Sequence, residues 1–60
     1  MKPRTYYWTI HHRDGSTTNY KTARTRKPFY EAKMEATNIA RIMGGYKVTH
    51  KQTVILKDAA

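Results

Sequence analysis

At 60 residues the chain has the length of one small domain, and folding at this size buries only about 60% of the unfolded chain's surface. Twelve Lys and Arg against four Asp and Glu give a formal charge of +8, which favours nucleic acid, an acidic protein or an anionic membrane surface as a partner. The lack of cysteine excludes a disulfide scaffold and a thiolate zinc site. There is also little room for an enclosed active site.

The N-terminal MKPR is not followed by an apolar segment and the chain has no long apolar run, which argues against a signal peptide and a transmembrane helix. The lack of cysteine fits a reducing compartment. We therefore expect one cytoplasmic domain, of the cell or of a host cell, over residues 1–60. Residues 1–4 and 58–60 are expected to fray.

The first predicted element is a strand from Thr5 to His12, with the sequence TYYWTIHH. Tyr6, Trp8 and Ile10 recur at period two, which is typical of a half-buried strand. This strand should lie in the middle of a small sheet and turn these three side chains to the core.

The sequence Arg13-Asp14-Gly15 after this strand predicts a hairpin turn with two possible registers. A two-residue turn would pair Trp8 with Lys21. A three-residue loop, with the glycine in the left-handed conformation, would pair Trp8 with Tyr20. We predict the three-residue loop, because it places the large apolar residue of the second strand on the buried face.

The second strand should run from about Ser16 to Ala23, followed by a basic connection that ends at Pro28. From Phe29 the apolar residues follow helical periodicity, and Gly44-Gly45 should end the helix. The stripe expected to face the sheet comprises Phe29, Ala32, Ala36, Ile39, Ala40 and Met43, whereas Glu31, Met34, Thr37, Asn38 and Arg41 should face away.

Residues 46–57 predict a third strand at the edge of the sheet, in which Tyr46, Val48, Val54 and Leu56 share one face. Whether this segment is one strand or is bent near residues 49–52 stays open, and His50 and Gln52 should project past the core or lie at a bend. A helix that returns along the sheet, with a right-handed crossover, places this strand beside the first one. The sequence thus predicts an α+β fold: a ββαβ domain with a three-stranded antiparallel sheet of order 2-1-3 and one helix on one face.

The opposite face of this sheet is the first candidate site. It should carry Tyr7 and His11 among threonines, with lysines on both flanking strands. Ammonium groups that can contact phosphates, next to a ring that can stack, are typical of sheets that bind nucleic acid. An ordinary solvated face would explain the threonines, but it does not readily explain why acidic residues are missing there.

The second candidate is the basic connection after the second strand, with Arg13 across the hairpin and Lys2 and Arg4 in the N-terminal tail. Such a loop is either a phosphate clamp or ordinary solvated charge. The candidate nucleic-acid-binding residues from both regions are Tyr7, His11, Arg13, Lys21, Arg24, Arg26, Lys27, Lys47 and Lys51.

An alternative partner site lies on the outer helix surface, where Tyr30, Met34 and Arg41 are residue types enriched at protein interfaces. These residues could anchor the chain on an acidic protein. The order of two strands, a helix and a third strand resembles small phage proteins that bind host machinery, including the podoviral inhibitor of bacterial RNA polymerase. The three-stranded sheets that read DNA in phage integrase N-terminal domains are a looser likeness, because their helix follows the third strand. The resemblance rests on the order of elements and implies no functional residues.

No catalytic, metal-binding or cofactor-binding residues are predicted. His11 and His12 are adjacent, so they should point to opposite faces of a strand and cannot readily share a metal. Glu31 and Glu35 lie among cations, which favours ion pairing over acid-base catalysis. We therefore expect a non-enzymatic binding protein.

Overall fold

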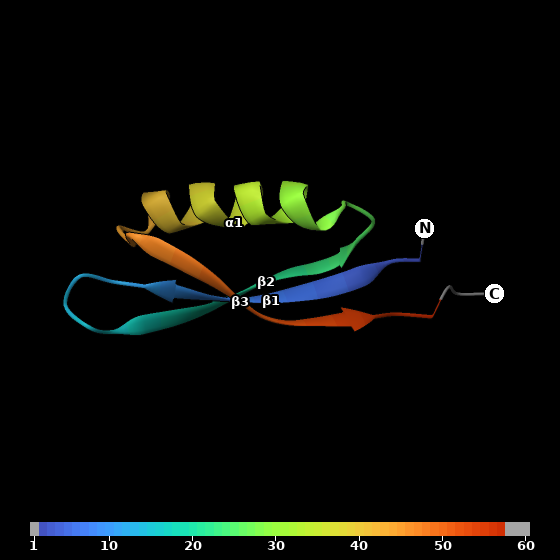
Figure 1. Ribbon diagram of the computed structural model, residues 1–60, viewed down its shortest axis with the longest axis horizontal. Coiled ribbons are helices and arrows are strands. Elements are labelled where there is room, and N and C mark those ends of the chain that lie inside the picture. The colour runs from blue at the N-terminus through green and yellow to red at the C-terminus, as the bar shows by residue number, and fades with distance from the viewer. Residues whose placement is uncertain (1, 58–60) are drawn as a thin grey trace.

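The computed structural model describes residues 2–57, which form three strands and one helix. In chain order these are β1 (Arg4–His11), β2 (Thr17–Thr25), α1 (Phe29–Ile42) and β3 (Lys47–Ile55). The strands form one antiparallel sheet in the order β2-β1-β3, and α1 covers one face of it (Figure 1). The predicted α+β fold is confirmed. The fraying expected of Met1 and of residues 58–60 falls outside the described residues.

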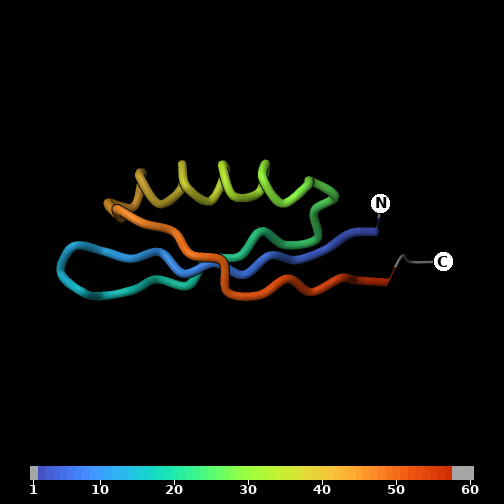
Figure 2. The backbone as a smooth tube through the Cα atoms, in the orientation of Figure 1, coloured from blue at the N-terminus to red at the C-terminus, as the bar shows by residue number. Residues whose placement is uncertain are grey.

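The molecule is elongated, with principal extents of 45 × 16 × 13 Å. The β1–β2 hairpin turn lies at one end, and the start of β1, the end of β3 and the connection from β2 to α1 lie at the other (Figure 2). Within residues 2–57, no helix has the length and apolarity needed to cross a lipid bilayer.

The β1–β2 hairpin has the predicted three-residue loop. Trp8 lies opposite Tyr20, and Gly15 has a φ of +92°. The Gly15 N–H donates to the His12 carbonyl at 3.1 Å, and the His12 N–H donates to the Ser16 carbonyl at 2.9 Å. The register therefore places the even-numbered residues of β1 on the face covered by the helix.

Replacing Gly15 by valine should lower the free energy of unfolding by more than about 1 kcal/mol, because a β-branched residue resists a positive φ. Urea denaturation followed by tryptophan fluorescence measures this loss. The control is Asp14→Ala, which removes only the hydrogen bonds that the exposed Asp14 carboxylate accepts from the Ser16 N–H and hydroxyl. If the two variants lost equal stability, the left-handed glycine would not be what holds the register.

A β-bulge in the middle of β3 reverses the facing of the second half of this strand. His50 lies opposite Trp8, and Gln52 lies opposite Tyr7, so Lys51 is an extra residue with no partner of its own on β1. Residues before the bulge keep the predicted alternation, and residues after it are shifted by one. The open question about this segment is thereby answered: it is one strand, bulged at Lys51.

The structure corrects two predictions about side chains of β3. Val54 was expected on the core side with Val48, but it lies opposite Thr5 on the face away from the helix. His50 was expected to project past the core or to lie at a bend. Instead its ring packs edge-on against Trp8 and Phe29, at centroid distances of 5.3 and 5.1 Å.

A second irregularity lies at the end of β2, where Arg24 has a φ of +48°. The register shifts by one residue there, and the Arg24 N–H donates to the Thr5 hydroxyl at 3.2 Å. β2 therefore continues to Thr25, beyond its predicted end at Ala23. The prediction that Arg4 frays is wrong, because Arg4 pairs with Thr25 on one side and with Ile55 on the other.

The core lies between α1 and the even-numbered residues of β1. Tyr6, Trp8 and Ile10 are the largest fully buried side chains, and the three alanines of the predicted helix stripe are buried against this face. Small helix residues let the backbone of α1 approach a sheet that carries large rings. Phe29 and Met43, also expected on the stripe, are 41% and 43% exposed, because they lie near the two ends of the helix.

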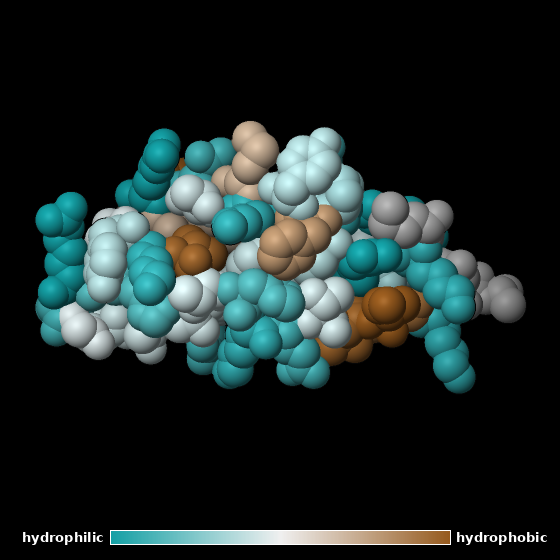
Figure 3. Space-filling view, viewed as in Figure 1, coloured by the Kyte–Doolittle hydropathy of each residue, from teal (hydrophilic) through white to brown (hydrophobic). Residues whose placement is uncertain are grey.

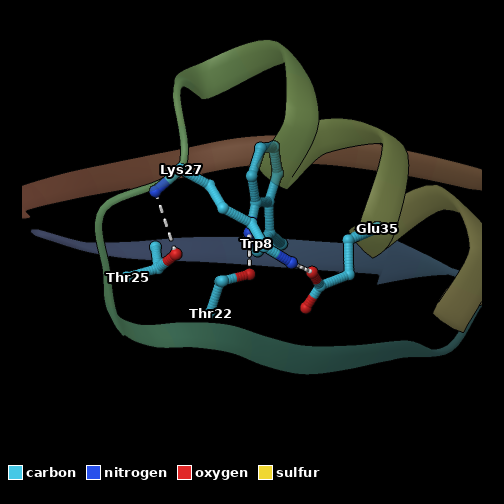
Figure 4. Close-up of polar contacts among 5 residues, drawn as sticks. All are labelled: Trp8, Thr22, Thr25, Lys27 and Glu35. Atoms are coloured by element: carbon cyan, nitrogen blue, oxygen red, sulfur yellow. Dashed lines mark hydrogen bonds and ion pairs between the residues drawn. The ribbon is translucent and has the colours of Figure 1, made fainter.

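The buried polar atoms of the two aromatic residues are satisfied. The Trp8 indole N–H donates to the Thr22 hydroxyl at 3.2 Å, and the Tyr6 hydroxyl donates to the Lys27 carbonyl at 2.9 Å. Figure 4 shows the Trp8 ring rising from β1 toward the helix. These bonds connect β1 to β2 and to the segment that precedes α1.

The helix ends as the Gly-Gly sequence predicted. Gly44 has a φ of +80°, and its N–H donates to the Arg41 carbonyl at 3.1 Å. The Gly45 N–H donates to the Ala40 carbonyl at 2.7 Å, which completes a Schellman motif. The Tyr46 N–H then donates to the His11 carbonyl, so the chain passes directly from the helix end onto the edge of β1.

Candidate nucleic-acid interface

The open face of the sheet is defined here as the face that α1 does not cover. Its central row comes from the odd-numbered residues of β1, because successive side chains of a strand alternate between faces. Thr9 lies between Asn19 and Thr49, and His11 lies between Thr17 and Lys47. The side chains that the sequence assigned to this face on β1 and β2 are therefore on it.

A groove of about 380 Å³ lies around Tyr7, and we call it the Tyr7 groove. Lys21 lies directly opposite Tyr7 on β2, whereas Gln52 occupies that place on β3 with Lys51 next to it. Three of the predicted site residues are thus brought together around one hollow. The residues that line it are Tyr7, Trp8, Asn19, Tyr20, Lys21 and Lys51.

Tyr7 differs from its two aromatic neighbours in having no partner within residues 2–57. Tyr6 and Trp8 are buried and hydrogen-bonded, and their rings contact each other and Phe29. Tyr7 is only partly buried, and among the described residues it makes no ring contact and no side-chain hydrogen bond. Its ring is therefore available to a ligand.

The cations of the Tyr7 groove are also unpaired within residues 2–57. Neither Lys21 nor Lys51 forms an ion pair with a described carboxylate. Of the acidic residues in this range, Asp14 is at the hairpin tip, and Glu31 and Glu35 are on α1. The open face therefore presents positive charge without a neighbouring acid in the part of the chain described.

The space-filling view agrees with this distribution. Hydrophilic side chains project below the middle of the sheet, on the side away from α1 (Figure 3). Hydrophobic side chains lie over the C-terminal part of β3 in the same view. The open face is thus polar around its centre and more apolar toward the end where Val54 lies beside Thr5.

His11 and Lys47 lie together at the hairpin end of the open face, outside the Tyr7 groove. The His11 Nε2 and the Thr49 hydroxyl are 3.0 Å apart and share a hydrogen bond, which ties this ring to β3. His11 is four positions from Tyr7 along β1, a distance of about 13 Å. His11 and Lys47 can therefore extend a binding surface, but they cannot contact the same ligand group as Tyr7.

The basic connection is less available than the sequence suggested. The Lys27 ammonium pairs with the Glu35 carboxylate on α1 (Figure 4). The hydrogen bond and the charge of Glu35 raise the pKa of Lys27 above its ordinary value of 10.5. Lys27 therefore points to the helix side. Arg24 and Arg26 are exposed, and Arg24 is held in the left-handed conformation described above.

Arg13 does not join this connection. It is exposed at the hairpin tip, whereas residues 24–27 lie at the opposite end of the sheet (Figure 1). Eight residues of β1 separate the two regions, a span of about 26 Å. The predicted cluster of Arg13 with the basic connection is therefore wrong.

The sequence reasoning missed Gln52, whose place opposite Tyr7 depends on the bulge. It also did not include Asn19 among the site residues, although Asn19 lines the Tyr7 groove. Both amides can donate and accept hydrogen bonds. A polar residue at an odd position of β2 was the available signal for Asn19, whereas no signal in the sequence located the bulge.

The outer surface of α1 carries the alternative partner site. Tyr30 and Met34 are 63% and 62% exposed. A second hollow, of about 330 Å³, contains Met34 and Arg41 but not Tyr30, and its lining residues are Lys33, Met34, Thr37, Asn38 and Arg41. We call this hollow the helix hollow.

The three histidines are each hydrogen-bonded to a threonine. His11 bonds with Thr49, His12 with Thr18, and His50 with Thr53. Within residues 2–57, no group of three or more His, Cys, Asp and Glu side chains is placed to hold a metal ion.

No family model, curated protein or solved structure matches this chain.

Proposed function

We propose that this protein is a non-enzymatic nucleic-acid-binding protein that uses the open face of its sheet. The observation that carries the proposal is the Tyr7 groove. Within residues 2–57, its ring has no side-chain partner and lies between two lysines that form no ion pair. Ammonium groups bind phosphates, and an exposed ring offers a surface for a base or a sugar. The formal charge of +8 supports steering of a polyanion toward this face.

The residues around the Tyr7 groove have separate roles in this proposal. Lys21 and Lys51 neutralise phosphates, and Asn19 and Gln52 hydrogen-bond to base edges or sugars. His11 and Lys47 extend the surface toward the hairpin. Arg24 and Arg26 add longer-range attraction, because they lie at the end of the same sheet. The proposed ligand is DNA or RNA.

The test is the salt dependence of binding to labelled oligonucleotides, in single-stranded and duplex forms of both DNA and RNA. Each phosphate neutralised contributes a slope of about −0.7 to −0.9 to log K against log salt. The double variant Lys21→Gln with Lys51→Gln should therefore weaken binding and flatten the slope by about 1.4 to 1.8 units.

The matched control is Lys33→Gln with Arg41→Gln, which removes the same two charges from the outer surface of α1. This pair should change the slope much less, because its side chains lie on the opposite side of the molecule. Equal effects of the two double variants would show that only net charge matters, and the proposed interface would be withdrawn.

A second candidate function is docking on an acidic protein through the outer surface of α1. The exposure of Tyr30 and Met34 and the neighbouring helix hollow favour it. Glu31 and Glu35 on the same helix weigh against it, since they would repel an acidic partner. The test is a pull-down from a nuclease-treated lysate. A protein that is captured by the Lys21/Lys51 double variant, but not by the double variant Tyr30→Ala with Met34→Ala, would favour this function.

A further inference from the structure

We infer that the Tyr7 groove binds an unpaired strand of DNA or RNA, with one base stacked on Tyr7 and the sugar-phosphate backbone running across the sheet from Lys21 to Lys51. This inference rests on the proposed function and specifies the form of its ligand. It depends on three features of the open face, which are the free ring, the direction in which the cations are arranged, and the flanking amides.

The free ring favours a base that has left its stack. In a duplex the faces of the bases are covered by their neighbours, and only base edges and phosphates reach a protein. The Tyr7 ring has no partner within residues 2–57 and is part of an open groove. A duplex could contact the lysines through its phosphates but would leave the Tyr7 ring without a contact, whereas an unpaired strand can contact both.

The arrangement of charge gives the direction of the strand. Along β1 the neighbours of Tyr7 on the same face are Thr5 and Thr9, which are uncharged. Across the sheet its neighbours are Lys21 on β2 and Lys51 beside the bulge of β3. Strands are about 4.8 Å apart, so the backbones that carry the two lysines are about 10 Å apart with the ring between them. A strand that crosses the sheet places one phosphate on each side of the stacked base.

The β3 bulge is what produces this arrangement. Without it Lys51 would take the position opposite Tyr7 and Gln52 would turn to the helix side. With it Gln52 lies opposite Tyr7 and Lys51 lines the groove next to it, so an ammonium and an amide lie together on the β3 side of Tyr7. On the β2 side Lys21 and Asn19 offer the same pair of groups. Tyr7 therefore has a cation and an amide on each of the two neighbouring strands.

The experiment measures binding by fluorescence anisotropy, with labelled thymidine and uridine single strands of about 12 nucleotides and duplexes of equal length. The variants are Tyr7→Leu, which keeps apolar bulk but not the ring, and Tyr7→Phe, which keeps the ring. Circular dichroism checks that both variants fold. We expect Tyr7→Leu to weaken single-strand binding by about five- to a hundredfold, the range for losing one stacked base. Tyr7→Phe should keep most of the affinity.

The salt slope separates stacking from charge. Tyr7→Leu should leave the slope for single strands unchanged, because no phosphate contact is lost, and should have little effect on duplex binding. Two results would overturn the inference: duplexes bound as tightly as single strands, or no effect of Tyr7→Leu on single-strand binding. If binding still depends on Lys21 and Lys51 as predicted, the proposed function stands in either case. Failure of every oligonucleotide to bind overturns both.

Discussion

Replacing Trp8 with alanine should leave the protein largely unfolded at room temperature. Trp8 is 1% exposed, and its ring centroid lies 5.3 to 6.0 Å from the ring centroids of Tyr6, Phe29 and His50. Truncation of a buried aromatic residue costs about 3 to 5 kcal/mol. At typical stabilities per residue, a chain of this length has only about 3 to 9 kcal/mol in total. The Thr22 hydroxyl would also lose the hydrogen bond that it accepts from the indole N–H.

Far-UV circular dichroism and urea denaturation measure this effect. The matched control is Tyr7→Ala, which truncates the neighbouring aromatic residue on the opposite face of the same strand. Tyr7 makes no described ring contact, so this variant should stay folded and lose much less stability. Unfolding by Tyr7→Ala together with tolerance of Trp8→Ala would reverse the assignment of the two faces.

Replacing Gly45 with alanine should lower the free energy of unfolding by about 1 to 3 kcal/mol, the cost of overpacking a filled site. A Cβ atom at Gly45 would lie 2.5 Å from the Ile10 Cγ2 atom and 3.2 Å from the His11 carbonyl oxygen. Ile10 is fully buried under the helix, so its side chain has no free space to move into. The helix end would have to shift away from β1.

A double-mutant cycle identifies the clash. Ile10→Leu removes the Cγ2 branch, so Gly45→Ala should cost less in that background, with a coupling of about 1 kcal/mol. Gly44→Ala is the control, since a Cβ there would meet no atom within 4 Å and would cost only its φ of +80°. Ile10→Leu should not relieve the Gly44→Ala loss. Strict additivity at Gly45 would contradict the proposed contact.

The first strand and the hairpin register could be predicted from the sequence because their signals are local. Tyr6, Trp8 and Ile10 alternate over five residues, and Gly15 lies where a three-residue loop needs a left-handed residue. The helix and its end were predictable for the same reason. Alanines at helical spacing and a Gly-Gly pair each describe a conformation that a short segment adopts by itself.

The facing of β3 after Lys51 could not be predicted in this way. Val54 shares even parity with Val48, and alternation alone therefore places both in the core. A bulge depends on how a strand fits its partner across the sheet, and the local pattern carries no information about that fit. The conformation of Arg24 belongs to the same class, because the bulge at the end of β2 is fitted to Thr5 on β1.

For the candidate site, the sequence by itself determined which residues of β1 and β2 share the open face, including Tyr7 and Lys21, because strand geometry and one turn suffice for that. Only the tertiary structure decided that Lys51 and Gln52 both flank the Tyr7 ring and that Lys27 is paired with Glu35. Each of these depends on the distance between side chains of different elements. That distance is set by the packing of α1 on the sheet and by the bulge in β3.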